Sequence, residues 1–287
     1  MPVPFQRVAI LGVGLIGGSL AKVLRKERPD IRIMGSGRTK ANLKTAESIG
    51  VIDGFDLDPA KAVAGAELVV LSPPVRSLES LARKIAHAIG EDTIVTDVGS
   101  VKKPVVDALE PVFSERGRFV GGHPIAGREK SGVGAATDSL FLGSRCILTP
   151  TPRTDRRAFS AVRALWEIAG CRVTEMPADV HDNIFAAVSH LPHVAAYALV
   201  NAVSDVRIRG EDPLIFSGGG FRDYTRIAES SPEMWRDICL MNAEPILRVL
   251  DGYEGVLNRL KQMIAARDGD GLLKEFERAR RVKEKMS

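Results

Sequence analysis

A glycine-rich turn near the N-terminus lies between a buried-strand pattern and a helix-forming run. Residues 7–28 read Arg-Val-Ala-Ile-Leu, then Gly-Val-Gly-Leu-Ile-Gly-Gly, then a run of good helix formers. In this context Gly12 permits a tight turn, Gly14 lets the backbone approach a pyrophosphate, and Gly17 lets the helix pack closely on the strand. Because unpaired N–H groups at a helix start favour phosphate oxygens, the pattern predicts a dinucleotide site rather than an incidental turn. The expected cofactor contacts here are Gly12, Gly14, Leu15, Ile16 and Gly17.

The second strand pattern, at 31–35, ends without the acidic residue that commonly binds the ribose hydroxyls of NAD. Asp30 precedes this strand and therefore lies at its wrong end. Potential phosphate donors follow the strand instead, and a guanidinium pairs well with a phosphate. We therefore expect NADP as the cofactor, with NAD as the alternative if Arg38 and Lys40 merely begin a solvated helix. The expected contacts are Ser36, Arg38 and Thr39, joined by Ser72 and Pro73 after a later strand.

Strand and helix patterns alternate through the first half of the chain. Apolar runs at 66–72 and 93–97 predict strands, and 75–89 places apolar residues at helical spacing. Such alternation predicts a doubly wound parallel sheet of the α/β class, in which the loops after the strands meet at one edge beside the cofactor. The residues expected on such loops are Ser72, Pro73, Asp97, Ser100 and His123. For Ser100, a cap of the following helix is an equal alternative.

The segment 121–132, Gly-Gly-His-Pro-Ile-Ala-Gly-Arg-Glu-Lys-Ser-Gly, follows the short apolar run 118–120. Its four glycines and one proline make it a poor helix and a poor strand interior. We therefore expect a turn that carries the imidazole of His123 and several charges out of a strand end, where sites are commonly built. On spacing alone, a glycine-rich turn with an incidental histidine is an equal alternative.

Strand patterns end at about residue 174, and from about residue 179 the pattern is helical. We therefore expect a dinucleotide-binding domain at 1–176 and a helical substrate and dimerisation domain at 177–287. The run 180–204 is mostly Ala, Val and Leu, which suits a buried helix in a bundle or a dimer core. The tail 271–287 is expected to be a charged amphipathic helix rather than a site. Its inward-facing residues are expected to be Leu272, Leu273 and Phe276.

Two histidines interrupt the apolar run, in the sequence Ser189-His190-Leu191-Pro192-His193. Helical spacing lets Ser189 or His190 share a face with His193, and Pro192 kinks a helix and frees a carbonyl. Buried histidines lose hydration unless they are hydrogen-bonded, so core histidines satisfied by the backbone are favoured on this segment alone. A substrate pocket is the alternative. We expect no metal site, because no third ligand is placed nearby.

Guanidinium groups occur at 218–226, Gly-Gly-Gly-Phe-Arg-Asp-Tyr-Thr-Arg. Three glycines followed by alternating charge predict a loop rather than a helix interior. Arg222 or Arg226 has the planar fork that binds a carboxylate, although a weak surface ion pair is the alternative for each. Just beyond, Ser231 and Pro232 predict the start of a helix.

The bulk composition narrows the class of protein. The chain has 287 residues and a net charge of +4 at pH 7, with no block of like charge that indicates a nucleic-acid tail. Its three cysteines show no metal-ligand spacing and are typical of reduced, packed thiols. No signal-peptide pattern opens the chain, and no apolar run is expected to reach membrane-spanning length. We therefore expect a cytoplasmic protein without a nucleic-acid or membrane partner.

Taken together, these motifs resemble the prephenate/arogenate dehydrogenase family of tyrosine biosynthesis. The matching segments follow that family's order along nearly the whole chain, at 12–19, 97–102, 121–132, 189–193 and 218–235. The glycine fingerprint is generic, whereas the histidine segment and the triple-glycine segment are specific. Gly37 is a departure, since many relatives carry there the acidic residue that anchors NAD. The resemblance implies a Rossmann-type nucleotide-binding domain, an all-α domain that forms a homodimer, and hydride transfer to NADP or NAD.

The reaction implied by the resemblance needs a proton acceptor. A cyclohexadiene substrate with two carboxylates gives up hydride from its hydroxyl-bearing carbon and loses carbon dioxide as the ring becomes aromatic. The hydroxyl proton then needs an acceptor with a pKa near neutrality. By resemblance His123 is that base, Ser100 hydrogen-bonds the same hydroxyl, and Arg226 binds a substrate carboxylate. The other substrate-binding residues that the resemblance implies are His190, His193, Glu129 and Lys130.

Several alternatives stay open at this point. Prephenate has a keto group on its side chain where arogenate has an ammonium group. Glu129 either pairs with that ammonium group or is an exposed loop charge. A short-chain 3-hydroxyacid dehydrogenase, the rival enzyme, needs a catalytic lysine in 180–204, which has none. A nucleotide-sensing binding protein, the rival from another class, has no need for His123, Ser100 and Arg226 together.

Overall fold

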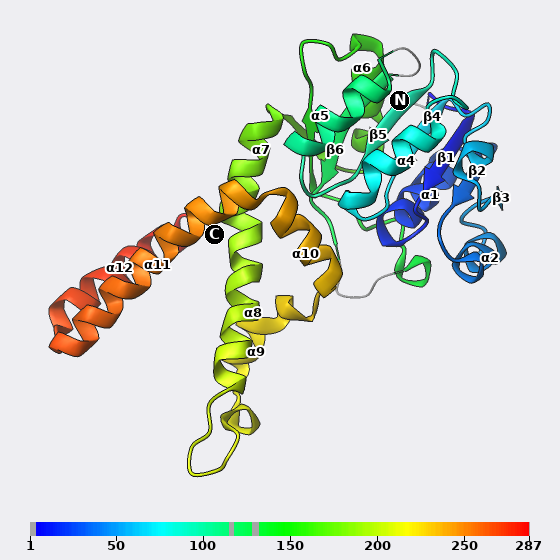
Figure 1. The fold of residues 1–287 in the computed structure, drawn as a ribbon. Helices are drawn as coiled ribbons and strands as arrows, with labels where there is room; N and C mark the ends of the chain where they lie inside the picture. The colour runs from blue at the N-terminus through cyan, green and yellow to red at the C-terminus, as the bar shows by residue number, and fades with distance from the viewer. Residues whose placement is uncertain (1–3, 115–117, 128–131, 287) are drawn as a thin grey trace.

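The computed structural model describes residues 4–114, 118–127 and 132–286. Its first part is an eight-stranded sheet in the order β3-β2-β1-β4-β5-β6-β7-β8 (Figure 1). The strands are β1 (Arg7–Leu11), β2 (Arg32–Ser36), β3 (Gly54–Phe55), β4 (Leu68–Leu71), β5 (Ile94–Asp97), β6 (Arg118–Pro124), β7 (Arg145–Thr149) and β8 (Arg172–Glu175). Strands β1 to β6 are parallel, β7 is antiparallel to β6, and β8 is parallel to β7. The predicted doubly wound α/β fold is confirmed.

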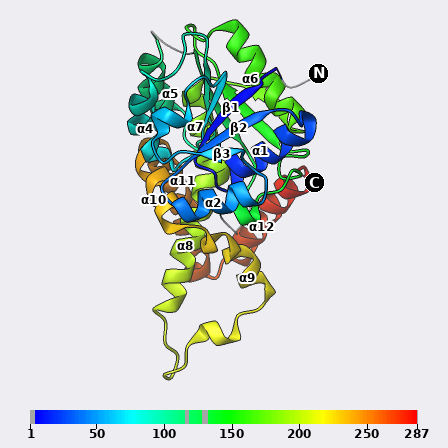
Figure 2. The ribbon, with the colours of Figure 1, turned by 90° about the vertical axis from the view of Figure 1, so that its right-hand side faces the viewer.

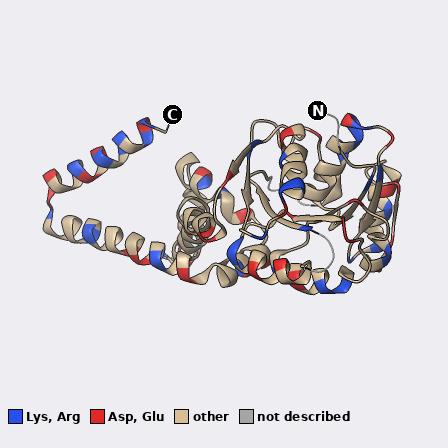
Figure 3. Cartoon of the chain, turned by 90° about the horizontal axis from the view of Figure 1, so that it is seen from above, with Lys and Arg blue, Asp and Glu red and all other residues tan. Residues whose placement is uncertain are grey.

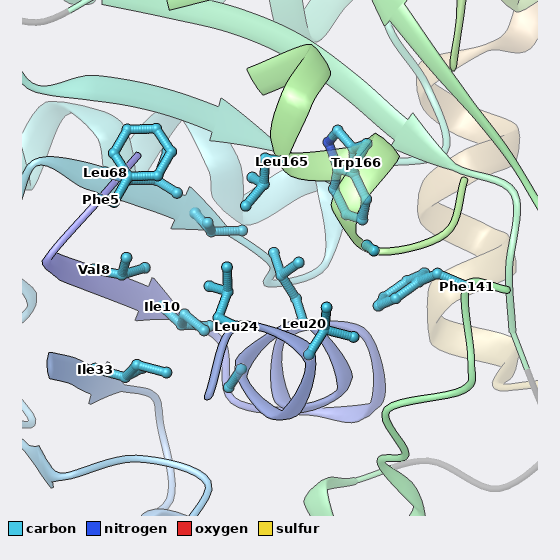
Figure 4. Packing of buried hydrophobic residues seen from close by; sticks show 14 of the residues in the cluster. Phe5, Val8, Ile10, Leu20, Leu24, Ile33, Leu68, Phe141, Leu165 and Trp166 are labelled. Atoms are coloured by element: carbon cyan, nitrogen blue, oxygen red, sulfur yellow. The ribbon is translucent and has the colours of Figure 1, made fainter. Parts of the chain in front are cut away.

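Helices cover both faces of this sheet (Figure 2). They are α1 (Leu15–Glu27), α2 (Lys40–Ser48), α3 (Pro59–Ala62), η1 (Val75–Ser77), α4 (Leu78–Ile85), α5 (Lys103–Val112), η2 (Val133–Ala135) and α6 (Arg156–Ile168). Strand side chains alternate between the two faces, so that Val8 and Ile10 join one buried cluster while Ala9 and Leu11 join the other. Helices α1 and α6 complete the first cluster, where Trp166 is fully buried (Figure 4). Helices α4 and α5 complete the second.

Strand β6 extends further than the sequence predicts. The expected turn from residue 121 onward was wrong for its first residues, because Gly121 to Pro124 pair with β7 and His123 lies opposite Ile147. Glycines are needed at positions 121 and 122 because neighbouring strands approach the backbone too closely for a side chain, and not because the chain turns there. A Cβ on Gly121 would lie 2.5 Å from the Thr149 hydroxyl, and one on Gly122 would lie 2.9 Å from the Asp97 carbonyl oxygen. His123 is therefore held within a strand, in the interior of the sheet.

The second part of the chain is helical. Its elements are α7 (Ala178–Phe185), the π-helical turn η3 (Ala186–His190), α8 (Leu191–Ser204), η4 (Pro213–Phe216), α9 (Gly219–Thr225), η5 (Arg226–Glu229), α10 (Pro232–Met241), α11 (Ala243–Ala266) and α12 (Gly269–Glu284). The prediction of a loop at 218–226 was wrong, since Gly219 to Thr225 form a helix that packs on α8. The helix start at Ser231 is confirmed, because its hydroxyl accepts a hydrogen bond from the Met234 N–H.

The segment Ala178–Ser204 is long and apolar enough to span a membrane by length and composition alone, contrary to the expectation from the sequence. Only 28% of its most apolar window is buried, so within this chain it is not the buried bundle helix that was one of the two predictions; a dimer core was the other. Val180, Ile184 and Val188 are among its exposed apolar residues. Core helices of proteins without membrane spans meet the same length and composition test. Here His181 and Asp182 on α7 are buried against the sheet, which ties the segment to the first domain.

Helices α11 and α12 form an arm that projects away from the sheet (Figures 1 and 3). The prediction that tail residues Leu273 and Phe276 face inward was wrong, because 56% and 58% of their surfaces are exposed. Figure 3 shows charged residues of both signs along α12, and the same helix carries Leu272, Leu273, Phe276 and Val282, so it is amphipathic as expected. Among the described residues, Leu273, Phe276 and Val282 of this helix stay more than half exposed, which indicates a surface for another molecule.

The fingerprint glycines allow a matched test of the fold. Gly12 has a φ of +102°, and an added Cβ would lie 2.6 Å from the Ser72 backbone, whereas one on Gly14 would meet nothing within 4 Å. We expect Gly12→Ala to lower the free energy of unfolding by roughly 1–3 kcal/mol or more. Gly14→Ala should change it by less than about 1 kcal/mol. Urea denaturation of both variants measures this, and equal midpoints would contradict the assigned turn.

Candidate active site

A cavity of about 500 Å³ opens at the carboxyl ends of β1, β2 and β4. The start of α1, where Gly14 is the N-cap, borders it, and the first N–H groups of a helix have no partner within that helix. The predicted cofactor residues that line it are Gly12, Gly14, Ser36, Arg38, Thr39, Ser72 and Pro73. Leu15, Ile16 and Gly17 do not line it. Gly17 instead brings α1 against β1, since a Cβ there would lie 2.5 Å from the Gly12 carbonyl oxygen.

The cavity fits a dinucleotide. The space beside Gly14 is open, so a pyrophosphate can approach the helix start closely. Asn42 donates to the Val13 carbonyl at 2.8 Å and so fixes the glycine loop against α2. The lining residues, all within the described part of the chain, include Arg38 and Lys84 but neither Asp nor Glu. The cavity therefore has positive charge and lacks a carboxylate where ribose hydroxyls are usually bound.

His123 is the most buried of the predicted catalytic groups, with 9% of its surface exposed. Its Nδ1 lies 2.8 Å from Nε2 of His181 on α7. Phe185, one turn further along α7, packs against both imidazoles, with ring centroids 5.0 Å from His123 and 4.4 Å from His181. The helical domain thus supplies every ring that contacts His123 among the described residues.

Asp182 joins the two domains. Its Oδ1 lies 2.7 Å from Nδ1 of the neighbouring His181. The same carboxylate accepts the backbone N–H groups of Lys102 and Lys103 at 2.7 and 2.8 Å, at the start of α5. These N–H groups have no partner within their own helix, so Asp182 caps α5 from the other domain. Neither His181 nor Asp182 was predicted from the sequence, although two polar residues opening an apolar helix were a signal.

A buried ion pair lies behind His123. The Lys102 ammonium, fully buried, donates to the Asp97 carboxylate and to the Gly122 carbonyl, the latter at 2.8 Å. Asp97 also accepts the N–H groups of Gly99 at 2.8 Å and Gly122 at 3.1 Å. The pair therefore holds the end of β5 to the residue before His123. Asp97 was expected at this edge, but the partnership with Lys102 was not.

His190 and His193 differ in their surroundings. His190 is 1% exposed, and its Nδ1 accepts from the Asn242 side chain at 3.0 Å, which fits a satisfied core histidine. His193 is partly exposed, donates from Nδ1 to the Ser189 carbonyl at 2.9 Å, and stacks on Trp235 with ring centroids 3.7 Å apart. Of the two, His193 therefore has surface to offer a ligand.

The remaining predicted site residues are Ser100, Arg226, Glu129 and Lys130. Ser100 lies half-buried on the β5–α5 loop, and it does not cap α5, whose N-cap is Lys102. Arg226 begins η5, which packs on α8, the helix of His193. Glu129 and Lys130 lie outside the described residues.

Burial keeps the site histidines uncharged. Burial, and then the charges of His181, Lys102 and His190, hold the pKa of His123 well below its ordinary value of 6.5. Burial lowers the pKa of His181 as well, against the opposing hydrogen bond to Asp182. It lowers the pKa of His190 to about 4. At neutral pH the His123 imidazole is consequently a free-base group that can accept a proton.

The chain resembles proteins of one kind along its whole length. A family model described as the prephenate dehydrogenase nucleotide-binding domain matches residues 20–175, and one described as the prephenate dehydrogenase dimerization domain matches 177–278. Cyclohexadienyl dehydrogenase of Zymomonas mobilis is 37% identical, covering 97% of this chain and 95% of that protein. Prephenate dehydrogenase of Bacillus subtilis is 37% identical, covering 95% and 74%.

Solved structures agree. Prephenate dehydrogenase of Aquifex aeolicus, in complex with hydroxyphenyl propionate and NAD+, is 39% identical with a TM-score of 0.92, covering 98% of each chain. Arogenate dehydrogenase of Synechocystis is 26% identical with a TM-score of 0.82, covering 98% of this chain and 100% of that one. The likeness therefore extends to both domains and to their relative arrangement.

The buried histidines predict a pH-dependent stability. Because their pKa values are depressed on folding, the unfolded chain binds more protons below pH 6.5, and the free energy of unfolding should fall as the pH falls from 6.5 to about 4. His190, with its pKa lowered to about 4, accounts for about 3 kcal/mol over that window. Urea denaturation across this range checks it. His190→Asn should flatten the pH dependence, while the exposed His87→Asn should not; equal slopes for both would contradict the assignment.

Proposed function

The chain belongs to the prephenate dehydrogenase family, and on that premise we propose that it oxidises and decarboxylates a cyclohexadienyl acid, prephenate or arogenate, with hydride transfer to NAD(P). The product is 4-hydroxyphenylpyruvate from prephenate or tyrosine from arogenate. One observation carries the proposal: the neutral imidazole of His123 lies buried in the sheet whose carboxyl edge forms the dinucleotide cavity. In our proposal the domain boundary lies between residues 176 and 177, where the sheet gives way to α7.

In the proposed reaction His123 is the group that accepts the proton of the substrate hydroxyl. A bound nicotinamide supplies the hydride acceptor. As the C–H bond at the hydroxyl-bearing carbon breaks, His123 takes the hydroxyl proton and a carbonyl forms. The electrons of the broken bond to carbon dioxide then pass through the ring to that carbonyl oxygen, which takes the proton back from His123 and becomes the phenol hydroxyl. Burial supports this role because it keeps the imidazole unprotonated at neutral pH and excludes water from its ring.

The remaining substrate contacts are proposals from the family resemblance. Ser100 hydrogen-bonds the substrate hydroxyl, and its freedom from the α5 cap supports that role. Arg226 binds a carboxylate through its planar fork. His193, which is partly exposed and stacks on Trp235, is a better candidate for the pocket wall than the enclosed His190. From the family resemblance alone, we propose that Glu129 and Lys130 also contact the substrate.

Steady-state turnover tests the function. The full chain should reduce NADP or NAD with prephenate or with arogenate, and the productive pair identifies the substrate. His123→Asn should lower kcat by at least about 100-fold, because it removes the general base, while the nucleotide Kd stays nearly constant. Tight nucleotide binding without turnover of either substrate would favour the binding-protein alternative. An unchanged kcat in His123→Asn would remove His123 as the base.

We propose NADP as the preferred cofactor. Ser36, Arg38 and Thr39 line the cavity at the end of β2, where a 2′-phosphate is bound in this fold, and Gly37 offers no carboxylate. The Aquifex relative was solved with NAD+, so the preference is argued from these residues alone.

Substituting Arg38 tests the preference. Arg38→Ala should raise KM for NADP by about 10- to 100-fold and leave KM for NAD within a few fold, because a charge-assisted pair with phosphate contributes about 1.5–3 kcal/mol. Lys40→Ala is the control, since Lys40 is exposed but does not line the cavity. Equal losses with both nucleotides would refute the role of Arg38.

The exposed apolar residues of the helical domain support a homodimer. Val188, Leu247 and Phe276 are each more than half exposed, and the matching family model is a dimerization domain. A solution mass of twice 31.0 kDa by light scattering is expected.

Cys146 and Cys171 are buried free thiols, which supports the cytoplasm as the compartment.

A further inference from the structure

Three side chains form a hydrogen-bonded series that ends at His123. Asp182 Oδ1 lies 2.7 Å from His181 Nδ1, and His181 Nε2 lies 2.8 Å from His123 Nδ1. All three residues are at least nine-tenths buried, so no bulk water competes for these contacts. Each neutral imidazole has one donor nitrogen and one acceptor nitrogen, and a hydrogen bond at one nitrogen therefore fixes the role of the other.

The direction of the series follows from Asp182. Its carboxylate accepts backbone N–H groups of Lys102 and Lys103, and an ionised carboxylate only accepts. His181 Nδ1 must then be the donor to Asp182, which leaves His181 Nε2 as an acceptor. His123 Nδ1 must in turn donate to His181. The lone pair of His123 is left on Nε2.

We propose that His181 and Asp182 are positioning residues that hold His123 in the tautomer with an unprotonated Nε2. The inference deepens the proposed function and rests on it only for its kinetic consequence. No proton travels along the series. When Nε2 takes the substrate proton, Nδ1–H keeps donating to His181, and the Asp182 carboxylate offsets the new positive charge through the intervening ring.

Among the described residues, the groups around His123 have partners of their own. The Lys102 ammonium is engaged with Asp97 and the Gly122 carbonyl, and His190 Nδ1 is engaged with Asn242. Phe185 packs on both imidazoles and restricts their rotation. Cys146 on β7 is a further ionisable neighbour, a buried thiol whose pKa is raised well above its ordinary value by burial and which therefore stays uncharged.

The series also crosses the joint between the domains. His123 belongs to β6, whereas His181 and Asp182 belong to α7. Correct docking of α7 onto the sheet is therefore a condition for the base to present its lone pair.

The tautomer can be observed directly. Histidine-selective ¹⁵N labelling of the full chain and a long-range ¹H–¹⁵N correlation spectrum at neutral pH distinguish a protonated from an unprotonated ring nitrogen. The chain has five histidines, and the signals lost in His123→Asn assign His123. We expect Nδ1 of His123 to carry the proton. A proton on Nε2 overturns the proposal, whatever the catalytic activity.

Two substitutions at one position test the kinetic consequence. His181→Leu removes the acceptor and should lower kcat roughly 10- to 100-fold with little change in substrate KM or nucleotide Kd. His181→Gln places an amide oxygen near the former Nε2 and should recover most of that loss. His87→Leu, an exposed control, should keep wild-type kcat.

The outcomes separate the two proposals. A wild-type kcat in His181→Leu, or no recovery in His181→Gln, overturns the positioning role. A loss confined to KM does so as well. If the wild-type chain turns over neither prephenate nor arogenate, the proposed function fails, and the spectrum still decides the tautomer. If His181→Leu does not fold, the wild-type spectrum and His181→Gln decide.

Discussion

The buried ion pair between Lys102 and Asp97 holds together the strand ends on which the site is built. Removing two charges from water is costly, and their attraction offsets that cost only when hydrogen bonds satisfy the remaining donors and acceptors. Here the Gly99 and Gly122 N–H groups and the Gly122 carbonyl do so. Loss of one partner of such a pair costs about 3–5 kcal/mol, since it leaves a buried charge uncompensated. The position of His123, the next residue after Gly122, depends on this network.

The nucleotide-binding half was predictable because its signals are local. The short apolar strand runs, the glycine fingerprint and the missing carboxylate at Gly37 each depend on a few adjacent residues. The extension of β6 was not predictable in this way. Glycine usually disfavours strands, and only the approach of Thr149 and Asp97 from neighbouring strands shows why Gly121 and Gly122 are required.

The polar network of the site was harder to predict from the sequence, because its members are far apart in the chain. Asp182 caps α5 from 80 residues away, and His181 meets His123 across 58 residues. Family motifs singled out residues such as His123 and Ser100 as candidates, but they did not indicate that His181 and Asp182 lie beside His123. The exposed faces of α11 and α12 show the same limit, because an amphipathic pattern predicts a covered side without saying whether the cover comes from the same chain.

The π-helical turn at Ala186–His190 changes which side of the continuous helix α7–η3–α8 each side chain occupies. The Leu191 N–H bonds back to the Ala186 carbonyl, five residues earlier, so this turn contains one residue more than an α-helical turn. Each residue advances an α-helix by about 100°, and everything beyond η3 is therefore rotated by about that angle. As a result, His181 on α7 contacts His123 in the nucleotide-binding sheet, while His193 on α8 stacks on Trp235. A chain of this fold without that extra residue would keep the helix but would turn a different set of α8 side chains toward Trp235.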